Sequence, residues 1–426
     1  MKRKLGWALA AGVVAVSLTM SGCGGSSSDS GSGDLSVAWW GSQDRNNYTV
    51  KMFKKFDAAH SGIEVTPQFT GWDGYWSKMS TEFGGGSAPD VLQMDKQYLR
   101  SYADKGTLTA LKNAGVNLGK LDKNSLATGT IDDKLYAIPS GVNAIAMFYD
   151  PAILKKAGVD FDPDSTMTWA QFAKIAAQVT KNDKGVYGTQ NMMGWLPGLK
   201  LFARDNGQEL YADDVKKLAV SKSTVTKWFE YWLDLQNKEY TPPASASASV
   251  GWGEIQKFPI VKKKAAFGFA WNSQYTAFKQ LVNRPLGMTL APGLGNGNKA
   301  YFLKPSMYWS ISKTSKSPKA AAKLVDYLVN SPKASKFIGT DRGVPINKDV
   351  RKSLEKKATG NDKKVISFIS RVDKIAGQAP PVDPSSTSQI LDLYHKIVQQ
   401  VEFKKISPSA GAANFIKQAN SILQQG

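Results

Sequence analysis

Aromatic side chains stand beside polar ones at several points where the sequence predicts that a β-strand ends. The stretch TGWDGYWSKM, at residues 70–79, holds two tryptophans and a tyrosine within five positions. The predicted strands 35–40 and 265–270 also end beside tryptophans. A sugar ring has an apolar face on which an indole can stack, and its hydroxyl groups can hydrogen-bond Asp, Asn, Gln and Arg. Apolar walls with a few well-placed polar groups are typical of ligand pockets, so this pattern favours carbohydrate binding.

The residues that most catalytic and metal sites need are scarce. The chain has two histidines, His60 and His395, and one cysteine, Cys23. These leave almost nothing for a Cys/His metal site or a Cys–His nucleophile, and neither a P-loop nor a G-x-S-x-G motif is present. We therefore predict no enzyme activity, no metal site and no cofactor. Two alternatives stay open: calcium in an acidic loop, without EF-hand spacing, and glycan cleavage by the carboxylates Asp44 and Asp95.

The N-terminus predicts export and attachment to a membrane. Three basic residues precede an apolar run at 5–20, which has the length of a signal-peptide core. The run leads into MSGC, which matches a bacterial lipobox ending at Cys23. We predict that residues 1–22 are removed, that Cys23 carries the lipid, and that residues 23–33 form a Gly/Ser tether outside the cell membrane. A signal peptide with a chance cysteine, or an uncleaved membrane helix, is the alternative.

The charge is strongly basic but dispersed. The formal net charge of +20 falls to +17 without the leader. Most of the excess is lysine in scattered pairs, and only residues 262–264 form a triplet. Nucleic-acid readers cluster Lys and Arg on one face, so we predict no nucleic-acid partner. An alternative explanation of the basic surface is attraction to an anionic membrane or to anionic wall polymers. A basic wall-binding adhesin is therefore a third possible function.

Alternating strand and helix patterns predict an α/β fold with a parallel sheet. The predicted strands are 35–40, 63–69, 91–94, 135–138, 145–149 and 265–270, and the predicted helices are 48–59, 75–83, 169–179, 225–235, 319–330, 389–402 and 412–424. We expect Asp73 to cap the helix at 75–83. In such sheets ligands bind outside the carboxyl ends of the strands. Trp40, Trp72 and Asp95, which follow the first three strands, should therefore meet at one edge.

Six segments together resemble a known family. They are the lipobox, the tether, VAWWGSQDR, TGWDGYWSKMSTEFGGGSAPDVLQMD, DDKLYAIPSGVNAIAMFYDPAILKKAG and TDRGVP. The chain resembles the bacterial extracellular solute-binding proteins of family 1, which are carbohydrate receptors of ABC importers. The resemblance implies a periplasmic-binding-protein-like type II fold, with two discontinuous α/β lobes joined by hinge strands. Lobe one would comprise 34–140 and 301–343, and lobe two 141–299 and 344–426, with crossings near 139–143, 304–308 and 342–345.

The same resemblance implies a monomeric receptor that binds an oligosaccharide between its lobes and delivers it to separately encoded permease subunits. The ligand-binding residues that it indicates are Trp40, Gln43, Asp44, Arg45, Trp72, Asp95, Asn143, Trp195, Trp271, Asn272 and Arg342. The GWDGYW stretch is most similar to the subgroup that imports plant-wall and other oligosaccharides, some of them acidic. For a uronate ligand, Arg45 and Arg342 are the expected carboxylate partners. We expect Trp72 to be the sugar platform and Trp76 to pack against the sheet.

Overall fold

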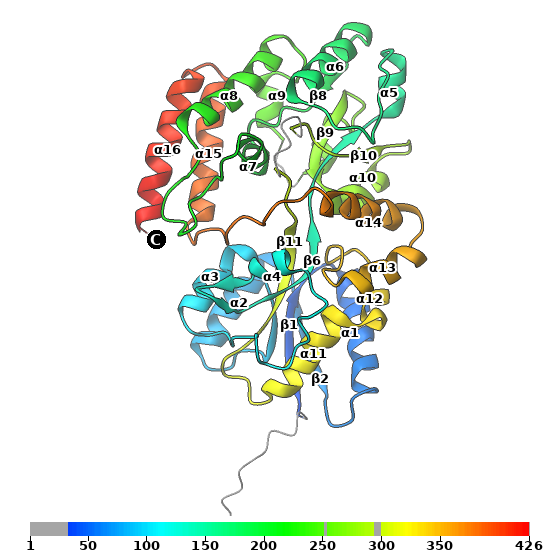
Figure 1. Ribbon diagram of the computed structural model, residues 1–426, viewed down its shortest axis with the longest axis vertical. Coiled ribbons are helices and arrows are strands. Elements are labelled where there is room, and N and C mark those ends of the chain that lie inside the picture. Colours follow the sequence, from blue (N-terminus) through cyan, green and yellow to red (C-terminus); the bar gives the residue numbers. More distant parts are fainter. Residues whose placement is uncertain (1–32, 251–253, 294–299, 426) are drawn as a thin grey trace, which may run out of the picture.

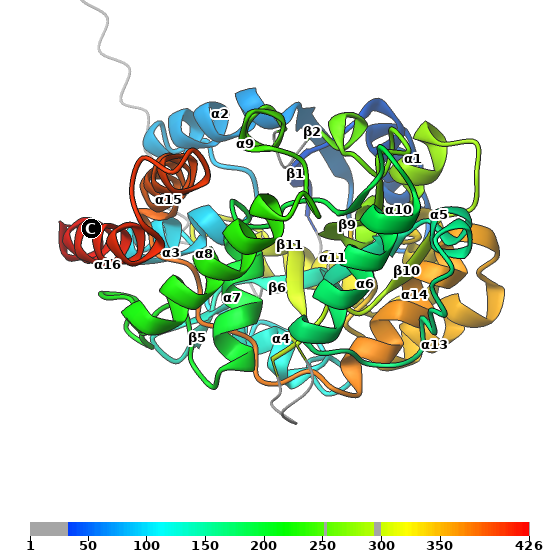
Figure 2. The same ribbon diagram turned by 90° about the horizontal axis from the view of Figure 1, so that it is seen from above.

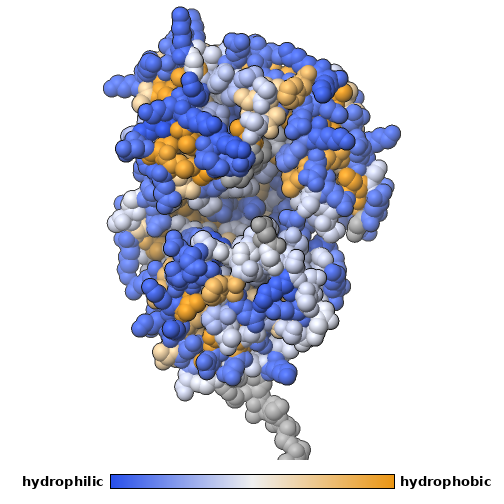
Figure 3. Space-filling view, turned by 180° about the vertical axis from the view of Figure 1, so that it is seen from behind, coloured by the Kyte–Doolittle hydropathy of each residue, from blue (hydrophilic) through white to orange (hydrophobic). Residues whose placement is uncertain are grey.

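The computed structural model describes residues 33–250, 254–293 and 300–425. The predicted signal peptide, the predicted lipidation site Cys23 and the rest of the tether up to residue 32 lie outside this part of the chain. Two β-sheets form the centres of two lobes, one above the other in Figure 1. Seen from behind, the surface narrows where the lobes meet, and the apolar side chains form separate patches (Figure 3). Within the described residues, no helix has the length and apolar character needed to cross a membrane.

Lobe one is built on a five-stranded sheet with the order β2-β1-β3-β11-β6. Its strands are β1 (Leu35–Trp40), β2 (Val65–Thr70), β3 (Val91–Met94), β6 (Ile138–Asn143) and β11 (Lys304–Ile311). β1 pairs in parallel with β2 and β3, whereas β11 runs antiparallel to β3 and β6. The helices of this lobe are α1 (Gln43–Asp57), α2 (Trp72–Gly84), α3 (Lys96–Asp104), α4 (Lys123–Ala127), α11 (Pro318–Asn330) and α12 (Pro332–Ile338), and a small hairpin joins β4 (Thr130–Ile131) to β5 (Lys134–Leu135).

Lobe two is built on a four-stranded sheet with the order β10-β7-β9-β8. Its strands are β7 (Ile145–Tyr149), β8 (Tyr187–Thr189), β9 (Ala265–Trp271) and β10 (Gly287–Thr289). Its helices are α5 (Pro151–Lys156), α6 (Trp169–Asn182), α7 (Leu196–Asp205), α8 (Lys222–Asn237), α9 (Ala244–Ala248), α10 (Tyr275–Leu281), α14 (Gly360–Asp373), α15 (Thr387–Glu402) and α16 (Pro408–Gln425), with short 3-10 turns at Ile255–Lys257 and Asn272–Gln274. The view from above in Figure 2 places α15 and α16 together at one side of this lobe. α13 (Lys348–Lys357) contacts α12 of lobe one and α14 of lobe two.

The chain passes from one sheet to the other between β6 and β7, which only Ala144 separates. Beside this crossing, the backbones of Gly141 and Gly343 approach so closely that a Cβ on Gly141 would lie 2.5 Å from the carbonyl carbon of Gly343. Gly343 also has a φ of 83°, which favours glycine. Ser306 of β11 donates a hydrogen bond to the carbonyl oxygen of Gly141 (3.0 Å). Three segments distant in sequence thus meet at one narrow connection, and such a connection can absorb a change of backbone angles on closure. The exact lobe boundaries stay a prediction.

Three expected element boundaries were wrong in ways that affect the site. α1 begins at Gln43, five residues early, because the Ser42 hydroxyl accepts a hydrogen bond from the Arg45 amide (3.4 Å) and caps the helix. α2 begins at Trp72 with Gly71 as its N-cap, so Asp73 lies inside the helix instead of capping it. The segment PSGVN is part of the buried strand β6, because it pairs with β11, and the hydrophobic pattern of an isolated sequence does not reveal that pairing.

Candidate ligand-binding site

The carboxyl ends of β1, β2 and β3 carry a cluster of aromatic side chains. Trp76 stacks on Tyr98 of α3, with ring centroids 3.8 Å apart, and packs at an angle to Trp40 at 5.7 Å. Trp72 contacts Trp40 edge-on at 5.1 Å. Trp40 and Trp76 are buried, but Trp72 is 41% exposed. Because its neighbours fix its orientation, Trp72 presents a rigid aromatic surface to the outside of lobe one.

A pocket of about 120 Å³ lies between the lobes, and we call it the interlobe pocket. Its lining comes from β11 and α3 of lobe one, from β9, α7 and α15 of lobe two, and from the segments beside them: Lys96, Leu196, Pro197, Lys200, Tyr211, Trp271, Phe302, Lys304, Asp383, Thr387 and Leu391. Pockets for ligands larger than a few atoms commonly measure roughly 300–1,000 Å³. An oligosaccharide would therefore require the lobes to stand further apart than they do here.

An aromatic side chain and a cation form one wall of the interlobe pocket. Trp271 ends β9, and the edge of Trp195, the residue before α7, packs against it with centroids 5.4 Å apart. The ammonium group of Lys304 lies 5.1 Å from the centroid of the Trp271 ring, within cation–π range. In the part of the chain that the structure describes, no carboxylate forms an ion pair with Lys304. Its ammonium group therefore retains donors for a ligand.

A single carboxylate oxygen lies at the centre of the pocket. Oδ1 of Asp383 accepts from Lys96 Nζ of lobe one (3.1 Å) and from Lys200 Nζ of lobe two (3.2 Å). Burial alone would raise the pKa of Asp383, but the two ammonium groups hold the pKa of this carboxyl well below its usual range. Burial lowers the pKa of Lys96 to about 8, because the attraction of Asp383 only partly offsets the loss of water.

Both arginines that were expected to bind a carboxylate already have partners in the protein. Arg45 Nε donates to Asp341 Oδ2 (2.7 Å), and Arg45 Nη2 donates to Oδ1 of the same carboxylate (3.1 Å). Arg342 is fully buried, donates to Gln93 Oε1 (3.0 Å) and lies over the ring of Trp309. Burial lowers the pKa of Arg342 to about 10. In this conformation Arg342 cannot reach a ligand, so we remove it from the candidate site and assign it a structural role.

The second correction concerns Asn272, which is also fully buried. Its Oδ1 accepts a hydrogen bond from the backbone N–H of Ala144 (2.8 Å), and its backbone N–H donates to the carbonyl oxygen of Ala144 (3.0 Å). Asn272 therefore fixes the crossing between the two sheets and does not face a ligand. Asn143, next to this crossing, is buried as well, and its Oδ1 has no hydrogen-bond partner among the described residues.

Three further predicted residues lie at the edge of lobe one. Gln43 and Asp44 occupy the exposed first turn of α1, and the Gln43 amide donates to Asn47 (2.9 Å). Asp95 caps α3 by accepting from the amide of Gln97 (2.8 Å), and burial raises the pKa of Asp95 despite the nearby Lys304. Since Asp95 follows β3 and precedes Lys96, it lies beside the interlobe pocket without lining it.

The sequence analysis missed the charged residues of the pocket. Lys96 had one available signal, because it directly follows the strand-end residue Asp95. Lys200 lies in an ordinary helical pattern, and Asp383 lies in a proline-rich connection. No local signal shows that residues 96, 200 and 383 meet.

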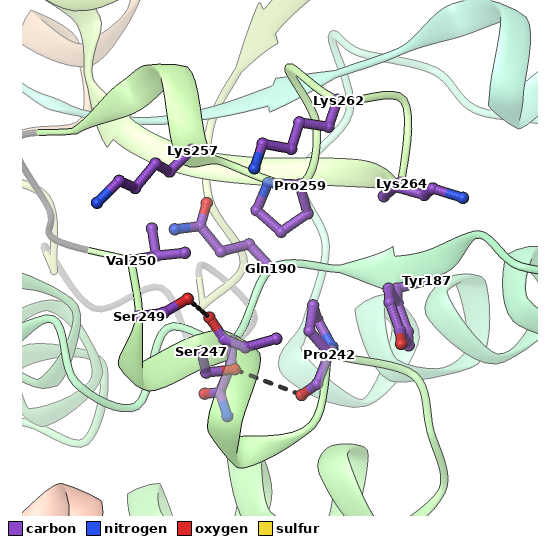
Figure 4. Close-up of a pocket in the computed structure, with 12 residues that line it drawn as sticks. Tyr187, Gln190, Pro242, Ser247, Ser249, Val250, Lys257, Pro259, Lys262 and Lys264 are labelled. Carbon is purple, nitrogen blue, oxygen red and sulfur yellow. Dashed lines mark hydrogen bonds between the residues drawn. The ribbon is translucent and has the colours of Figure 1, made fainter.

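A larger pocket of about 230 Å³ lies within lobe two and is shown in Figure 4. Its residues run from Tyr187 to Lys264 and include Gln190, Pro242, Ser247 and Pro259. Because one lobe supplies the whole lining, movement of the lobes would not open or close this pocket. The interlobe pocket, which both lobes line, is the better candidate for a ligand that couples them.

Comparison with known proteins identifies the family of the chain. Residues 51–364 match the family model described as "Bacterial extracellular solute-binding protein". The chain belongs to this family. A family 1 extracellular solute-binding protein from Alicyclobacillus acidocaldarius is 30% identical, covers 92% of this chain and 99% of its own, and superposes with a TM-score of 0.79. The architecture is therefore the two-lobed type II fold of periplasmic binding proteins.

The names of two more distant relatives state which carbohydrate each protein binds. A periplasmic oligogalacturonide-binding protein from Yersinia enterocolitica has the same fold, with 24% identity, a TM-score of 0.79 and coverage of 92% of this chain and 99% of that one. The diacetylchitobiose-binding protein of Streptomyces coelicolor is 23% identical over 305 residues, which are 69% of this chain and 70% of that protein. The family consists of binding proteins, and its named relatives here bind carbohydrates.

Proposed function

We propose that this protein is a lipid-anchored extracellular receptor that binds an oligosaccharide between its lobes and delivers it to the permease of an ABC importer, without catalysis. The observation that carries the proposal is the interlobe pocket, where Trp271 and Lys304 face a space that Lys96 closes from lobe one. Trp72 adds an exposed aromatic surface at the strand-end edge of lobe one. Aromatic surfaces with few polar groups suit a sugar.

The size of the pocket supports binding with a movement of the lobes. The ligand would enter an open form and stabilise a closed one by contacting both walls, which is a shift between conformations that already exist. The close backbone approach at Gly141 and Gly343 is a suitable place for that movement. Cys23, as the lipid-bearing residue, would keep the receptor near the permease on the outer face of the cell membrane.

We further propose that the ligand is an acidic oligosaccharide and that Lys304 contacts its carboxylate. Lys304 is the candidate because Arg45 is paired with Asp341 and Arg342 is buried. The ammonium group of Lys304 already lies over Trp271, so one ligand unit would stack on the indole while its carboxylate meets the lysine. The oligogalacturonide-binding relative supports this ligand class.

Tryptophan fluorescence and calorimetry against a carbohydrate panel test the proposal. The panel contains oligogalacturonides of two to four units, the corresponding neutral galacto-oligosaccharides, xylo-oligosaccharides and malto-oligosaccharides. We expect saturable binding of one class, a higher melting temperature and no cleavage products. Absence of binding across the panel would refute the sugar assignment. Release of shorter sugars would instead indicate a hydrolase that uses Asp44 and Asp95, and strongly salt-dependent binding of wall polymers without closure would indicate an adhesin.

A further inference from the structure

The connection between α14 and α15 runs along the boundary between the lobes (Figure 1), although both helices belong to lobe two. We call this connection, residues 374–386, the strap. The carbonyl oxygen of Gln378 in the strap accepts a hydrogen bond from Arg204 of lobe two (2.7 Å). Val382 instead is buried in the apolar core of lobe one, together with Trp40 and Tyr308. The strap therefore joins two helices of lobe two and buries the side chain of Val382 in lobe one.

Three prolines flank Asp383 in the strap. Pro380 and Pro381 precede Val382, and Pro384 follows Asp383. Because proline fixes its own φ and restricts the residue before it, the strap has few conformations available. Asp383 is therefore held at its position by the chain as well as by its partners.

Asp383 connects the two lobes by ion pairs. Lys96 begins α3 of lobe one, and Lys200 lies on α7 of lobe two, yet both donate to the same oxygen of Asp383 at 3.1 and 3.2 Å. The side chain of Asp383 is 21% exposed, and those of the two lysines are 7% and 11% exposed. These pairs are less screened by water and salt than a surface pair would be. Without the carboxylate, two ammonium groups would face each other across the lobe boundary.

We propose that the strap is a clamp in which Asp383 holds lobe one to lobe two when no ligand is bound. Opening separates Lys96 from Asp383 and withdraws Val382 from the core of lobe one. The clamp sets how often the free protein opens its interlobe pocket. It concerns the protein without ligand, so it is independent of which sugar the pocket takes.

Distance measurements between spin labels test the clamp directly. Cysteines replace the exposed Lys51 on α1 and Lys155 on α5 in a full-length chain with Cys23→Ser, and the interlobe distance distribution is recorded by pulsed electron paramagnetic resonance without any carbohydrate. Asp383→Asn keeps the size of the side chain and removes the charge. Lys96→Met removes the lobe-one partner. We expect both variants to shift the distribution away from that of the parent protein.

Asp150→Asn is the matched control, because Asp150 pairs with Arg284 (2.7 Å) entirely within lobe two and Asn retains its N-capping role at α5. We expect this control to lower the melting temperature without changing the interlobe distance. Distributions for Asp383→Asn and Lys96→Met that superimpose on the parent's would overturn the clamp. A shift in the control as large as in the clamp variants would also overturn it, since loss of any buried ion pair would then suffice. If the Asp383→Asn protein does not fold, the interlobe distance distribution of Lys96→Met alone tests the clamp.

Discussion

Replacement of Trp72 by alanine separates ligand contact from packing. An indole side chain offers roughly 200 Å² of surface, and 41% of Trp72 is exposed, which leaves about 80 Å² for a ligand to cover. At about 25 cal/mol per Å² this area corresponds to about 2 kcal/mol, or roughly a 30-fold rise in Kd. Calorimetry with the tightest-binding member of the carbohydrate panel measures this change.

Trp76 provides the contrast, because it is 9% exposed and packs against Tyr98, Tyr75 and Trp40. Trp76→Ala should cost about 3–5 kcal/mol of unfolding free energy through the cavity it leaves. Trp72→Ala should lower stability much less, because the lost contacts are fewer. A Trp72→Ala protein with unchanged Kd would refute the platform role. A Trp76→Ala protein that folds normally but binds no sugar would show that the two roles are reversed.

Three further predictions concern charges. Lys304→Met should weaken binding of oligogalacturonides at least tenfold by calorimetry and change binding of neutral sugars little, and equal losses for both would refute a carboxylate contact. Arg342→Met should lower the free energy of unfolding measured in urea by about 3 kcal/mol or more, since it leaves Gln93 and Thr49 without their charged partner. If folded Arg342→Met protein instead binds the sugar with a Kd raised more than tenfold, Arg342 belongs to the ligand site. Burial raises the pKa of Glu402 from 4.5 to about 7. The protonated side chain therefore contributes stability below pH 4.5, and this contribution of roughly 3 kcal/mol is lost as the pH rises to about 7. Glu402→Gln should lose less stability over this pH range in urea titrations, and parallel stability–pH curves for parent and variant would contradict the assignment.

Local patterns predicted about half of the helices and strands, and they missed β11, α7 and α14 and the full length of β6. β1, β3, α6 and α15 were predicted closely because their apolar spacing and caps lie within a few residues of one another. β6 was mistaken for a connection, since five of its six residues, PSGVN, include proline and glycine. Its strand character comes from pairing with β11, more than 160 residues later in the chain, and a local pattern carries no record of such a partner.

The same limit explains which site residues could be predicted. Tryptophans at the strand ends of lobe one can be identified because parallel strands place their carboxyl ends at one edge, and Trp72 follows such an end. Trp271 also ends a strand, β9, but β9 runs antiparallel to its neighbour β7. The roles of the two arginines could not be predicted, because a buried arginine and a ligand-binding arginine can have the same neighbours in sequence. Only the fold shows that Asp341 neutralises Arg45 and that Trp309 covers Arg342.

The charge balance of the interlobe pocket links the clamp to the proposed ligand. Asp383 pairs with Lys96 and Lys200, whereas Lys304 forms no ion pair among the described residues and is attracted at longer range by the nearby carboxylate of Asp95. The single negative charge of Asp383 does not balance the positive charges of Lys96, Lys200 and Lys304, which all line the pocket. Because one carboxylate is shared by two lysines and a third lysine lies beside Trp271, the closed pocket still favours one more anionic group. An acidic sugar that binds Lys304 would thus not compete with Asp383 for Lys96 and Lys200, and it would occupy the pocket in a form whose lobes stand further apart than in the clamped one.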